Sequence, residues 1–408
     1  MLTLRCSNLG ELTDQGRQTT LNLGRRLRHL YVDQVKFMPR LISDSDMIYL
    51  RTTPSPRALE SMQQSFWGLY PPSTRTMNFP PPTIITRTPA DETLFPNDGN
   101  CRRFSQLSRA FAQRTADRWN HTAEMEYLNK LIGKWMHDGG PVAIDSHPRL
   151  SGIMDTVNST LAHPEETRLP KEFYDKRGRE IMDRIETEEW FSGYRESVEY
   201  RTLGIGALLG DVVSRMVGNV EHNGNDGLVE VGGDDETPGV GRGGETAIKF
   251  AMSGCHDTTL AAILASLGTF EGETLKWPPY TSYIALELFR DEKESSARTQ
   301  DIQKNTPAVS SSMSGKTEVS PRSGLWNALF GAFVGKEQND MPSTAAPGIA
   351  RRAISELDPA EKGKLEGYYV RMRYNDKAMV IPGCQTVGNH RDGDESLCTL
   401  VCWSRKIQ

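Results

Sequence analysis

Residues 248–268 read IKFAMSGCHDTTLAAILASLG: an apolar run, a turn that carries His256 and Asp257, and a second apolar run with helical spacing. We expect a short buried strand followed by a helix. A residue at the carboxyl end of a parallel strand, just before a helix, lies where α/β sheets bind ligands. Backbone N–H groups and the helix dipole favour an anion at that place. The stretch therefore predicts an anion site on an α/β sheet.

Arg57 stands in the same relation to its own predicted strand, residues 47–53, and to the helix after it. Two such turns that converge would hold an imidazole and a guanidinium on a phosphate, with Asp257 able to protonate a departing oxygen. This is phosphatase chemistry. A structural alternative stays open, because a helix-start arginine is commonly a solvated surface residue and a strand-end histidine is commonly a satisfied core group. His137-Asp138 repeats the doublet without such a strand or helix, so the pair alone is not specific.

Composition excludes several classes of protein. The 408 residues carry 48 Lys and Arg against 53 Asp and Glu, so no general basic field exists to hold nucleic acid. Mean hydropathy is -0.53, and we find no apolar run near the roughly 20 residues of a membrane span, so no integral membrane segment is expected. The N-terminal residues lack signal-peptide features. A cytoplasmic location is the default, with secretory or mitochondrial routes open if the N-terminus is incomplete.

The six cysteines are scattered. Cys384 and Cys398 flank a polar loop, and a bridge between them is an alternative for an oxidising compartment. We expect free thiols.

The pattern along the chain predicts a core interrupted by two other regions. Residues 284–288 and 368–374 alternate as two half-buried strands that pair. Between them, Ser, Thr, Lys and Gln are too abundant for a packed core. An apolar island at 324–335, GLWNALFGAFVG, is expected to be a short helix on the core, with a membrane or partner contact as the alternative. We predict an α/β core in residues 1–129, a helical cap in 130–220, more core in 221–290, a largely disordered insertion in 291–365, and the last strand and C-terminus in 366–408.

Two segments resemble nucleotide-binding motifs, but their neighbouring residues do not fit such a site, and no cofactor is predicted. Residues 239–244 match GxGxxG but precede a predicted strand, so no helix N-terminus receives a phosphate there. Gly315-Lys316-Thr317 resembles the end of a Walker A loop, but position 310 is serine.

Four segments in order resemble the histidine acid phosphatases, branch two of the histidine phosphatase superfamily. They are GELTDQGRQTTLNLGRRLRHLY (10–31), YLRTTPSPRALESMQQSFWGLYP (49–71), ETLFPNDGNC (92–101) and SGCHDTTLAAILASLG (253–268), with IPGC (381–384) before a final cysteine. KWPPY at 276–280 is most similar to the lysophosphatidic acid phosphatase type and its fungal relatives. The resemblance covers most of residues 9–400, apart from the insertion.

The resemblance implies an α/β fold with a doubly wound, phosphoglycerate-mutase-like sheet and a helical cap. It implies hydrolysis of phosphate monoesters through a phosphohistidine, without metal or organic cofactor. The expected partner is a small-molecule or lysophospholipid phosphomonoester, with lysophosphatidate as one candidate. Carried over residue by residue, Arg57 and His256 bind the phosphate and Asp257 gives a proton to the leaving alcohol.

The family nucleophile is the histidine of an RHGxRxP motif at the end of the first strand, ahead of the segment at 10–31. This chain has no such motif. Of its eight histidines only His29 follows an arginine, inside the first predicted helix, so we expect His29 to be solvated. We expect the first strand, the nucleophile and two phosphate-binding arginines to lie upstream of Met1, and the 408-residue chain alone to be nearly inactive.

Two alternatives from other classes remain. A non-catalytic member could retain the phosphate site as a binding or regulatory scaffold. A metal-dependent His-Asp phosphohydrolase would need further helical His and Asp ligands at metal spacing, and we find none, so no metal site is predicted.

Overall fold

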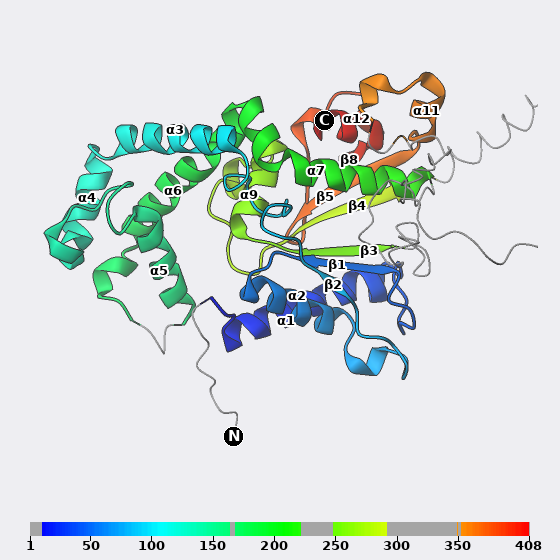
Figure 1. Cartoon of the computed structure of the whole chain (residues 1–408), viewed down its shortest axis with the longest axis horizontal. Helices are drawn as coiled ribbons and strands as arrows, with labels where there is room; N and C mark the ends of the chain where they lie inside the picture. Colours follow the sequence, from blue (N-terminus) through cyan, green and yellow to red (C-terminus); the bar gives the residue numbers. More distant parts are fainter. Residues whose placement is uncertain (1–9, 164–167, 222–247, 292–348, 350–351, 408) are drawn as a thin grey trace, which may run out of the picture. The chain divides into compact units, whose positions relative to one another are not determined.

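The computed structural model describes residues 10–163, 168–221, 248–291, 349 and 352–407 (Figure 1). Those in 1–290 and 348–408 belong to one compact unit, and the fold below is the fold of that unit. The apolar segment 324–335 and the patterns at 239–244 and 315–317 lie outside the described residues.

A parallel three-stranded sheet carries the two turns singled out from the sequence. Strand β1 (Ile48–Thr52) lies between β2 (Ile84–Ile85) and β3 (Phe250–Gly254). Every residue of β1 is buried, as the central strand of a parallel sheet requires. Thr52 pairs with Gly254, so β1 and β3 end at the same edge.

Helices cover both faces of β1. On one face, α1 (Asp14–Arg28) and α2 (Pro56–Leu69) pack their apolar stripes against Ile48 and Leu50. On the other, α7 (Val198–Glu221) brings Arg215 over the Tyr49 ring, 4.2 Å from its centroid. Figure 1 shows α2 and α7 on opposite sides of β1. The α/β class with helices on both faces, expected from the resemblance, is confirmed.

Local sequence explains where α1 and α2 begin and how closely they pack. Thr13, the N-cap of α1, accepts a hydrogen bond from the Gly16 N–H at 3.1 Å. Where α1 meets α2, a Cβ on Gly24 would lie 2.0 Å from the Ser65 carbonyl oxygen, and one on Gly68 would lie 2.2 Å from that of Leu21. The two backbones therefore approach each other only because both residues are glycine.

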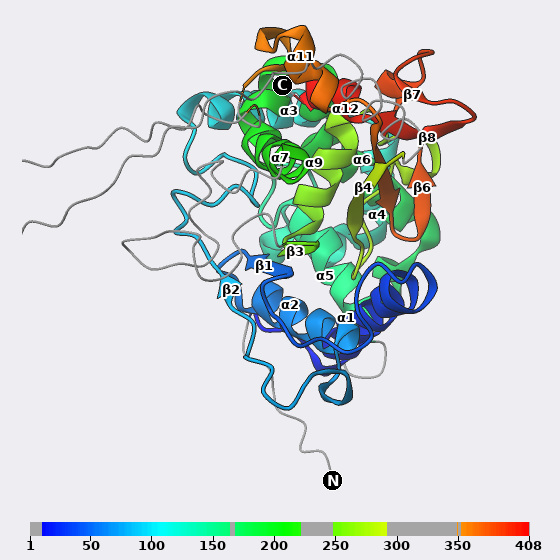
Figure 2. The ribbon, with the colours of Figure 1, turned by 90° about the vertical axis from the view of Figure 1, so that its right-hand side faces the viewer.

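A second, antiparallel sheet lies beside α12 (Leu400–Ile407). Strand β4 (Ile284–Arg290) pairs with β5 (Tyr368–Tyr374) along its whole length, which confirms the pairing predicted from their alternation. The remaining strands are β6 (Lys377–Met379), β7 (His390–Arg391) and β8 (Asp394–Thr399), in the order β4-β5-β8-β7 with β6 on β5 (Figure 2).

The two sheets approach each other at β3 and β4, and each of these strands has one edge without a strand partner among the described residues. Among the described strands, β3 pairs only with β1 and β4 pairs only with β5. Ala251 and Ser253 of β3 are exposed, whereas Tyr49 and Arg51, opposite them on β1, are buried. Tyr31 contacts both strands: its ring lies 5.3 Å from that of Phe250, and its hydroxyl donates to Glu287 of β4 at 2.8 Å.

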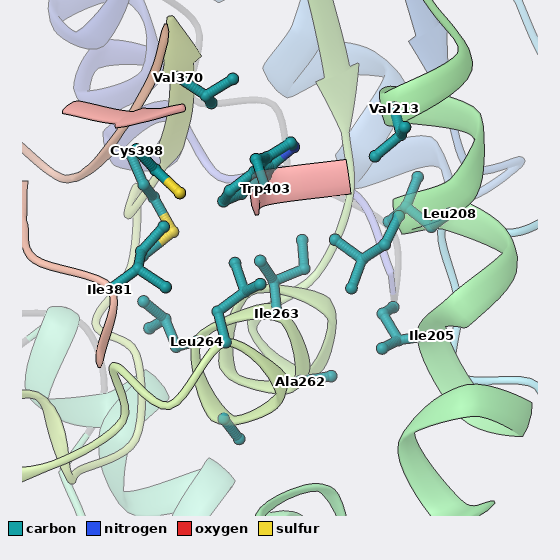
Figure 3. Packing of buried hydrophobic residues seen from close by; sticks show 14 of the residues in the cluster. Ile205, Leu208, Val213, Ala262, Ile263, Leu264, Val370, Ile381, Cys398 and Trp403 are labelled. Atoms are coloured by element: carbon teal, nitrogen blue, oxygen red, sulfur yellow. The ribbon is translucent and has the colours of Figure 1, made fainter. Parts of the chain in front are cut away.

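The largest buried cluster joins α7, α9 (Asp257–Ser266) and α12 to β5 and β8. Figure 3 shows Trp403 at its centre, between Ile263 and Leu264 of α9 and Val213 of α7. Because α9 is buried along almost its whole length, the turn that begins it is held rigidly against the sheet.

The helical region begins earlier in the chain than predicted. It contains α3 (Arg102–Trp119), α4 (Ala123–Ile132), α5 (Leu150–Ala162) and α6 (Lys176–Glu196), and starts at residue 102 where 130 was expected. Helix α7, assigned to the cap by its sequence, packs instead in the core that contains α9. Short helices are the π-helix η1 (His29–Gln34) and the 3-10 turns η2 (Pro72–Thr74), η3 (Gly133–Trp135), η4 (His137–Gly139), η5 (Lys171–Tyr174), η6 (Gly272–Thr274), η8 (Ile354–Glu356) and η9 (Pro382–Cys384).

Two further predictions are corrected by the structure. The predicted insertion, 291–365, extends too far, because Ile354 and Leu357 are buried in the main core and α11 occupies Pro359–Lys364. Cys384 and Cys398 form a disulfide, where free thiols were expected. The backbone brings their Cα atoms to 5.4 Å, which the 14-residue sequence separation does not reveal.

One described helix, α7, is long and apolar enough to cross a membrane by length and composition. Its Ile205, Leu209 and Val213 are buried in the protein core.

A buried carboxyl pair in α6 allows a stability prediction. Burial and the charge of Glu189 raise the pKa of Glu186 far above its ordinary value, so Glu186 is uncharged at neutral pH in the folded state. The unfolded chain releases this proton at a lower pH, so the group costs stability as pH rises above its unfolded pKa. We expect Glu186→Gln to raise the melting temperature at pH 8 and to leave it nearly unchanged at pH 4, measured by calorimetry.

The matched control is Glu188→Gln, on the same helix. Glu188 forms an ion pair with Arg118 at 2.9 Å, so its neutral variant should show no gain in melting temperature at pH 8. Equal melting shifts for Glu186→Gln at both pH values would contradict the prediction.

Candidate active site

The structure brings the three predicted site residues to one edge of the parallel sheet. Arg57 is the second residue of α2, just after β1, and His256 caps α9, just after β3. Asp257 is the first residue of α9. Because β1 and β3 are parallel and end in register, their following turns lie side by side.

His256 is held by two residues that the sequence did not single out. Its Nε2 lies 3.0 Å from the Thr53 hydroxyl, and its ring stacks on Phe95 with centroids 5.1 Å apart. Burial and the positive charge of Arg57 lower the pKa of His256, while Asp257 and Glu92 act in the opposite direction. The imidazole is therefore fixed, and an anion bound beside it would favour its charged form.

Arg57 differs from its neighbour Arg51 in what surrounds its guanidinium. Arg51 is buried and paired with Glu92 at 2.5 Å and Asp211 at 3.4 Å. Arg57 is exposed, and no carboxylate among the described residues pairs with it. Arg57 can therefore accept a ligand anion, whereas Arg51 already has its counter-ions.

The Arg51–Glu92 pair supports the loop that carries Phe95. Glu92 also accepts a hydrogen bond from the Leu94 N–H at 2.7 Å, and the Leu94 carbonyl accepts one from Thr259 of α9 at 2.6 Å. These bonds tie the loop to both strand ends, so the ring stacked on His256 has a defined position.

Asp257 accepts two hydrogen bonds. Its Oδ1 accepts from the Thr258 N–H at 2.8 Å, and its Oδ2 accepts from the indole N–H of Trp277 at 2.7 Å. Backbone and side chain thus both orient the carboxyl group at the start of α9.

Helix α5 carries a carboxyl group, Asp155, that interacts electrostatically with Asp257. Burial and the charge of Asp257 raise the pKa of Asp155, and Arg57 opposes this effect, so all three charges share one space. One turn later, the Ser159 hydroxyl lies 3.3 Å from that of Tyr280, which is 61% exposed. This side of the site therefore consists of hydrogen-bonding groups that a leaving alcohol could meet.

Cys255 adjoins His256 but is not poised as a nucleophile. Burial raises the pKa of its thiol to about 12. The reactive form of cysteine is the thiolate, so at neutral or acidic pH Cys255 is a structural residue.

Two other histidines singled out from the sequence, His29 and His137, do not lie at a strand-to-helix turn. His29 is exposed at the start of η1, as predicted, with its Nε2 3.0 Å from the Gln34 amide nitrogen. His137 lies in η4, outside any strand-to-helix turn. Among the described residues, the group of His, Cys, Asp and Glu side chains close enough to share a metal ion is Cys384, Cys398 and Cys402, and the first two form the disulfide.

Comparison with known proteins identifies relatives for most of the chain. The histidine phosphatase superfamily (branch 2) matches residues 6–303. A probable acid phosphatase of Schizosaccharomyces pombe is 34% identical over 400 residues, which cover 98% of this chain and 74% of that protein. Lysophosphatidic acid phosphatase type 6 of Homo sapiens is 25% identical over 285 residues, which cover 69% of this chain and 57% of that protein. The chain thus spans about three quarters of the first relative and less than two thirds of the second.

Solved structures agree on the fold. Hafnia alvei phytase in complex with tartrate matches with a TM-score of 0.55 at 12% identity, over 99% of this chain and 88% of that one. The same phytase with myo-inositol hexakis sulphate gives a TM-score of 0.54. At this identity the likeness concerns the fold alone. The family match and the S. pombe relative place the chain by sequence: it belongs to branch 2 of the histidine phosphatase superfamily.

Proposed function

We propose that the protein hydrolyses phosphate monoesters at the edge formed by Arg57, His256 and Asp257. The observation that carries this proposal is the guanidinium of Arg57, which pairs with no carboxylate of the described residues, beside a fixed imidazole and a carboxyl group at the carboxyl ends of adjacent parallel strands. The family match and the name of the S. pombe relative support the same reaction.

In the proposed reaction, Arg57 and His256 hold the phosphoryl oxygens and neutralise their charge. A histidine nitrogen attacks phosphorus, the phosphorus–oxygen bond to the alcohol breaks, and Asp257 gives its proton to the leaving oxygen. Water then takes the phosphoryl group from the histidine and returns a proton to Asp257. Phosphate and the free enzyme result.

The attacking histidine is proposed to come from a strand outside the described residues. Support comes from the open edges of β3 and β4, both in contact with Tyr31, and from the exposed Ala251 and Ser253. One more parallel strand there would join the two sheets, and its carboxyl end would lie beside His256. The RHGxRxP segment that the family places on such a strand is absent from the 408 residues.

The test compares two proteins: the 408-residue chain, and the same chain preceded by a strand with the RHGxRxP sequence. We expect both to bind inorganic phosphate by calorimetry, and only the second to release nitrophenol from nitrophenyl phosphate. Turnover by the 408-residue chain alone would contradict the proposal that the nucleophile comes from an additional strand. Phosphate binding by both without turnover would favour a scaffold.

That scaffold, a non-catalytic phosphate-binding or regulatory member, is the second candidate. The scaffold hypothesis is favoured by the positions of Arg57 and His256. Both anion ligands lie within the described residues, whereas the attacking histidine does not.

Lysophosphatidate is the candidate substrate we favour. Four of the relatives carry that substrate in their names. Two exposed aromatic rings also lie near Asp257: Tyr280, and Trp190, which is 42% exposed and whose ring centroid lies 5.9 Å from that of Trp277. Packing of about two methylenes on these rings is worth about tenfold in affinity. We expect kcat/KM in the protein with the added strand to be about tenfold higher for lysophosphatidate than for glycerol 3-phosphate. The Trp190→Ala variant should reduce this preference, and equal values for both substrates would contradict it.

The lowered pKa of His256 predicts proton uptake on anion binding. The free imidazole is uncharged over part of the mildly acidic range where an ordinary histidine is cationic, and an anion held by Arg57 and His256 raises the pKa of His256 again. Affinity should therefore increase as pH falls. Sulfate, which keeps its charge in this range, is the probe: calorimetry in buffers of different ionisation enthalpy should detect uptake that His256→Gln abolishes. Uptake that persists in His256→Gln would contradict the assignment.

A further inference from the structure

Trp277 makes a polar contact with the reacting end of the site that the family motif does not explain. Its indole N–H donates to Asp257 Oδ2 at 2.7 Å. An indole can donate but cannot accept. Trp277 therefore binds the carboxyl group without competing for the proton that Asp257 would transfer.

Helix α6 determines where the indole lies. The Trp277 backbone N–H donates to Asp183 Oδ1 of α6 at 3.0 Å. Its ring contacts Phe191 at 5.1 Å and Trp190 at 5.9 Å, both also on α6. The indole thus belongs structurally to the helical region, although its hydrogen bond reaches α9.

The second oxygen of Asp257 is held from a different direction. Oδ1 accepts from the Thr258 N–H, within α9 itself. Two donors from separate elements fix the plane of the carboxyl group, which a single bond would leave free to rotate.

We propose that Trp277 is a positioning residue for Asp257, which orients the carboxyl group and links its orientation to helix α6. The proposal rests on the proposed function only in assigning proton donation to Asp257. The hydrogen bond itself can be tested without turnover.

The first experiment is nuclear magnetic resonance of the 408-residue chain labelled with 15N in its seven tryptophans. Trp277→Phe identifies the Trp277 indole signal by its loss. We expect the chemical shift of this signal to change in Asp257→Asn, which replaces the carboxyl group by an amide. Trp135→Phe is the matched control: it removes an exposed indole in η3 and should leave the Trp277 signal unchanged.

Asp183→Ala tests the link to α6. Loss of its oxygen should loosen Trp277 and speed exchange of the indole hydrogen with solvent, whereas Asp183→Asn keeps an acceptor oxygen and should behave as the parent chain. A Trp277 indole signal that is the same in the parent chain and in Asp257→Asn would overturn the proposal. Because Asp257→Asn and Asp183→Ala leave Trp277 in place, the test does not depend on the folding of Trp277→Phe.

Kinetics give a second, separate readout. In the protein with the added RHGxRxP strand, Trp277→Phe should slow an alkyl phosphate about tenfold more than nitrophenyl phosphate. Equal slowing would assign Trp277 a structural role only. Absence of turnover in the parent would count against the proposed function, while the indole signal in Asp257→Asn would still decide whether Trp277 acts on Asp257.

Discussion

Asp257→Asn is expected to slow hydrolysis of alkyl phosphate monoesters by about 100-fold or more, and that of nitrophenyl phosphate by about tenfold or less. An alkoxide is a poor leaving group that needs a proton as the bond to phosphorus breaks, whereas nitrophenolate leaves without one. The asparagine keeps the size of the side chain and a hydrogen-bond acceptor for Trp277, so the loss reports the proton.

The measurement is kcat for the two esters at several acidic pH values, in the protein with the added RHGxRxP strand. Asp155→Asn is the control, because Asp155 faces the same space from α5 but is not expected to protonate the leaving oxygen. It should slow both esters alike. If Asp257→Asn also slows both esters alike, Asp257 is not the general acid.

Arg57→Ala is expected to weaken binding of inorganic phosphate by about 100-fold, because a guanidinium makes two charge-assisted hydrogen bonds of roughly 1.5 kcal/mol each. Arg57 has no carboxylate partner among the described residues, so its removal should cost little stability. Calorimetry with phosphate measures the effect on the 408-residue chain, and product inhibition measures it during turnover.

Two further variants sharpen this result. Arg57→Lys keeps the charge but loses the planar fork, so its affinity should lie between those of the parent and the alanine variant. Arg109→Ala removes another exposed arginine, on α3, and should leave phosphate binding unchanged. Unchanged phosphate affinity in Arg57→Ala would make Arg57 a surface residue.

The strand, turn and helix of residues 248–268 were predicted correctly from the sequence, because the pattern that specifies them lies within those residues. An apolar run of strand length, a polar turn and an apolar helical run specify β3, the turn at His256 and α9 without reference to the rest of the chain. The pairing of β4 with β5 was predictable for a similar reason, since both strands alternate along their length. The carry-over of Arg57 depended on motif order, and the structure places Arg57 at the matching strand end.

The surroundings of these residues come from segments far apart in the sequence. Thr53 is 203 residues from His256, and Trp277 reaches Asp257 across 20 residues that include all of α9. The sequence gives no sign that Phe95 contacts His256, because its side chain has no polar group. Asp155 is equally hard to single out, because it is one of 53 acidic residues. Motif reasoning did include the segments of Phe95 and Trp277, but it assigned them no role.

The sequence by itself determined the α/β class, the strand-to-helix turns with Arg57, His256 and Asp257, and the absence of an RHGxRxP motif from the 408 residues. Only the tertiary structure decided which groups orient His256 and Asp257, where the helical region begins, and that Cys384 and Cys398 are joined. The reason is physical: periodicity and turn chemistry act over a few residues, whereas a hydrogen bond or a disulfide requires two distant backbones to be brought within a few ångströms by packing of the whole core.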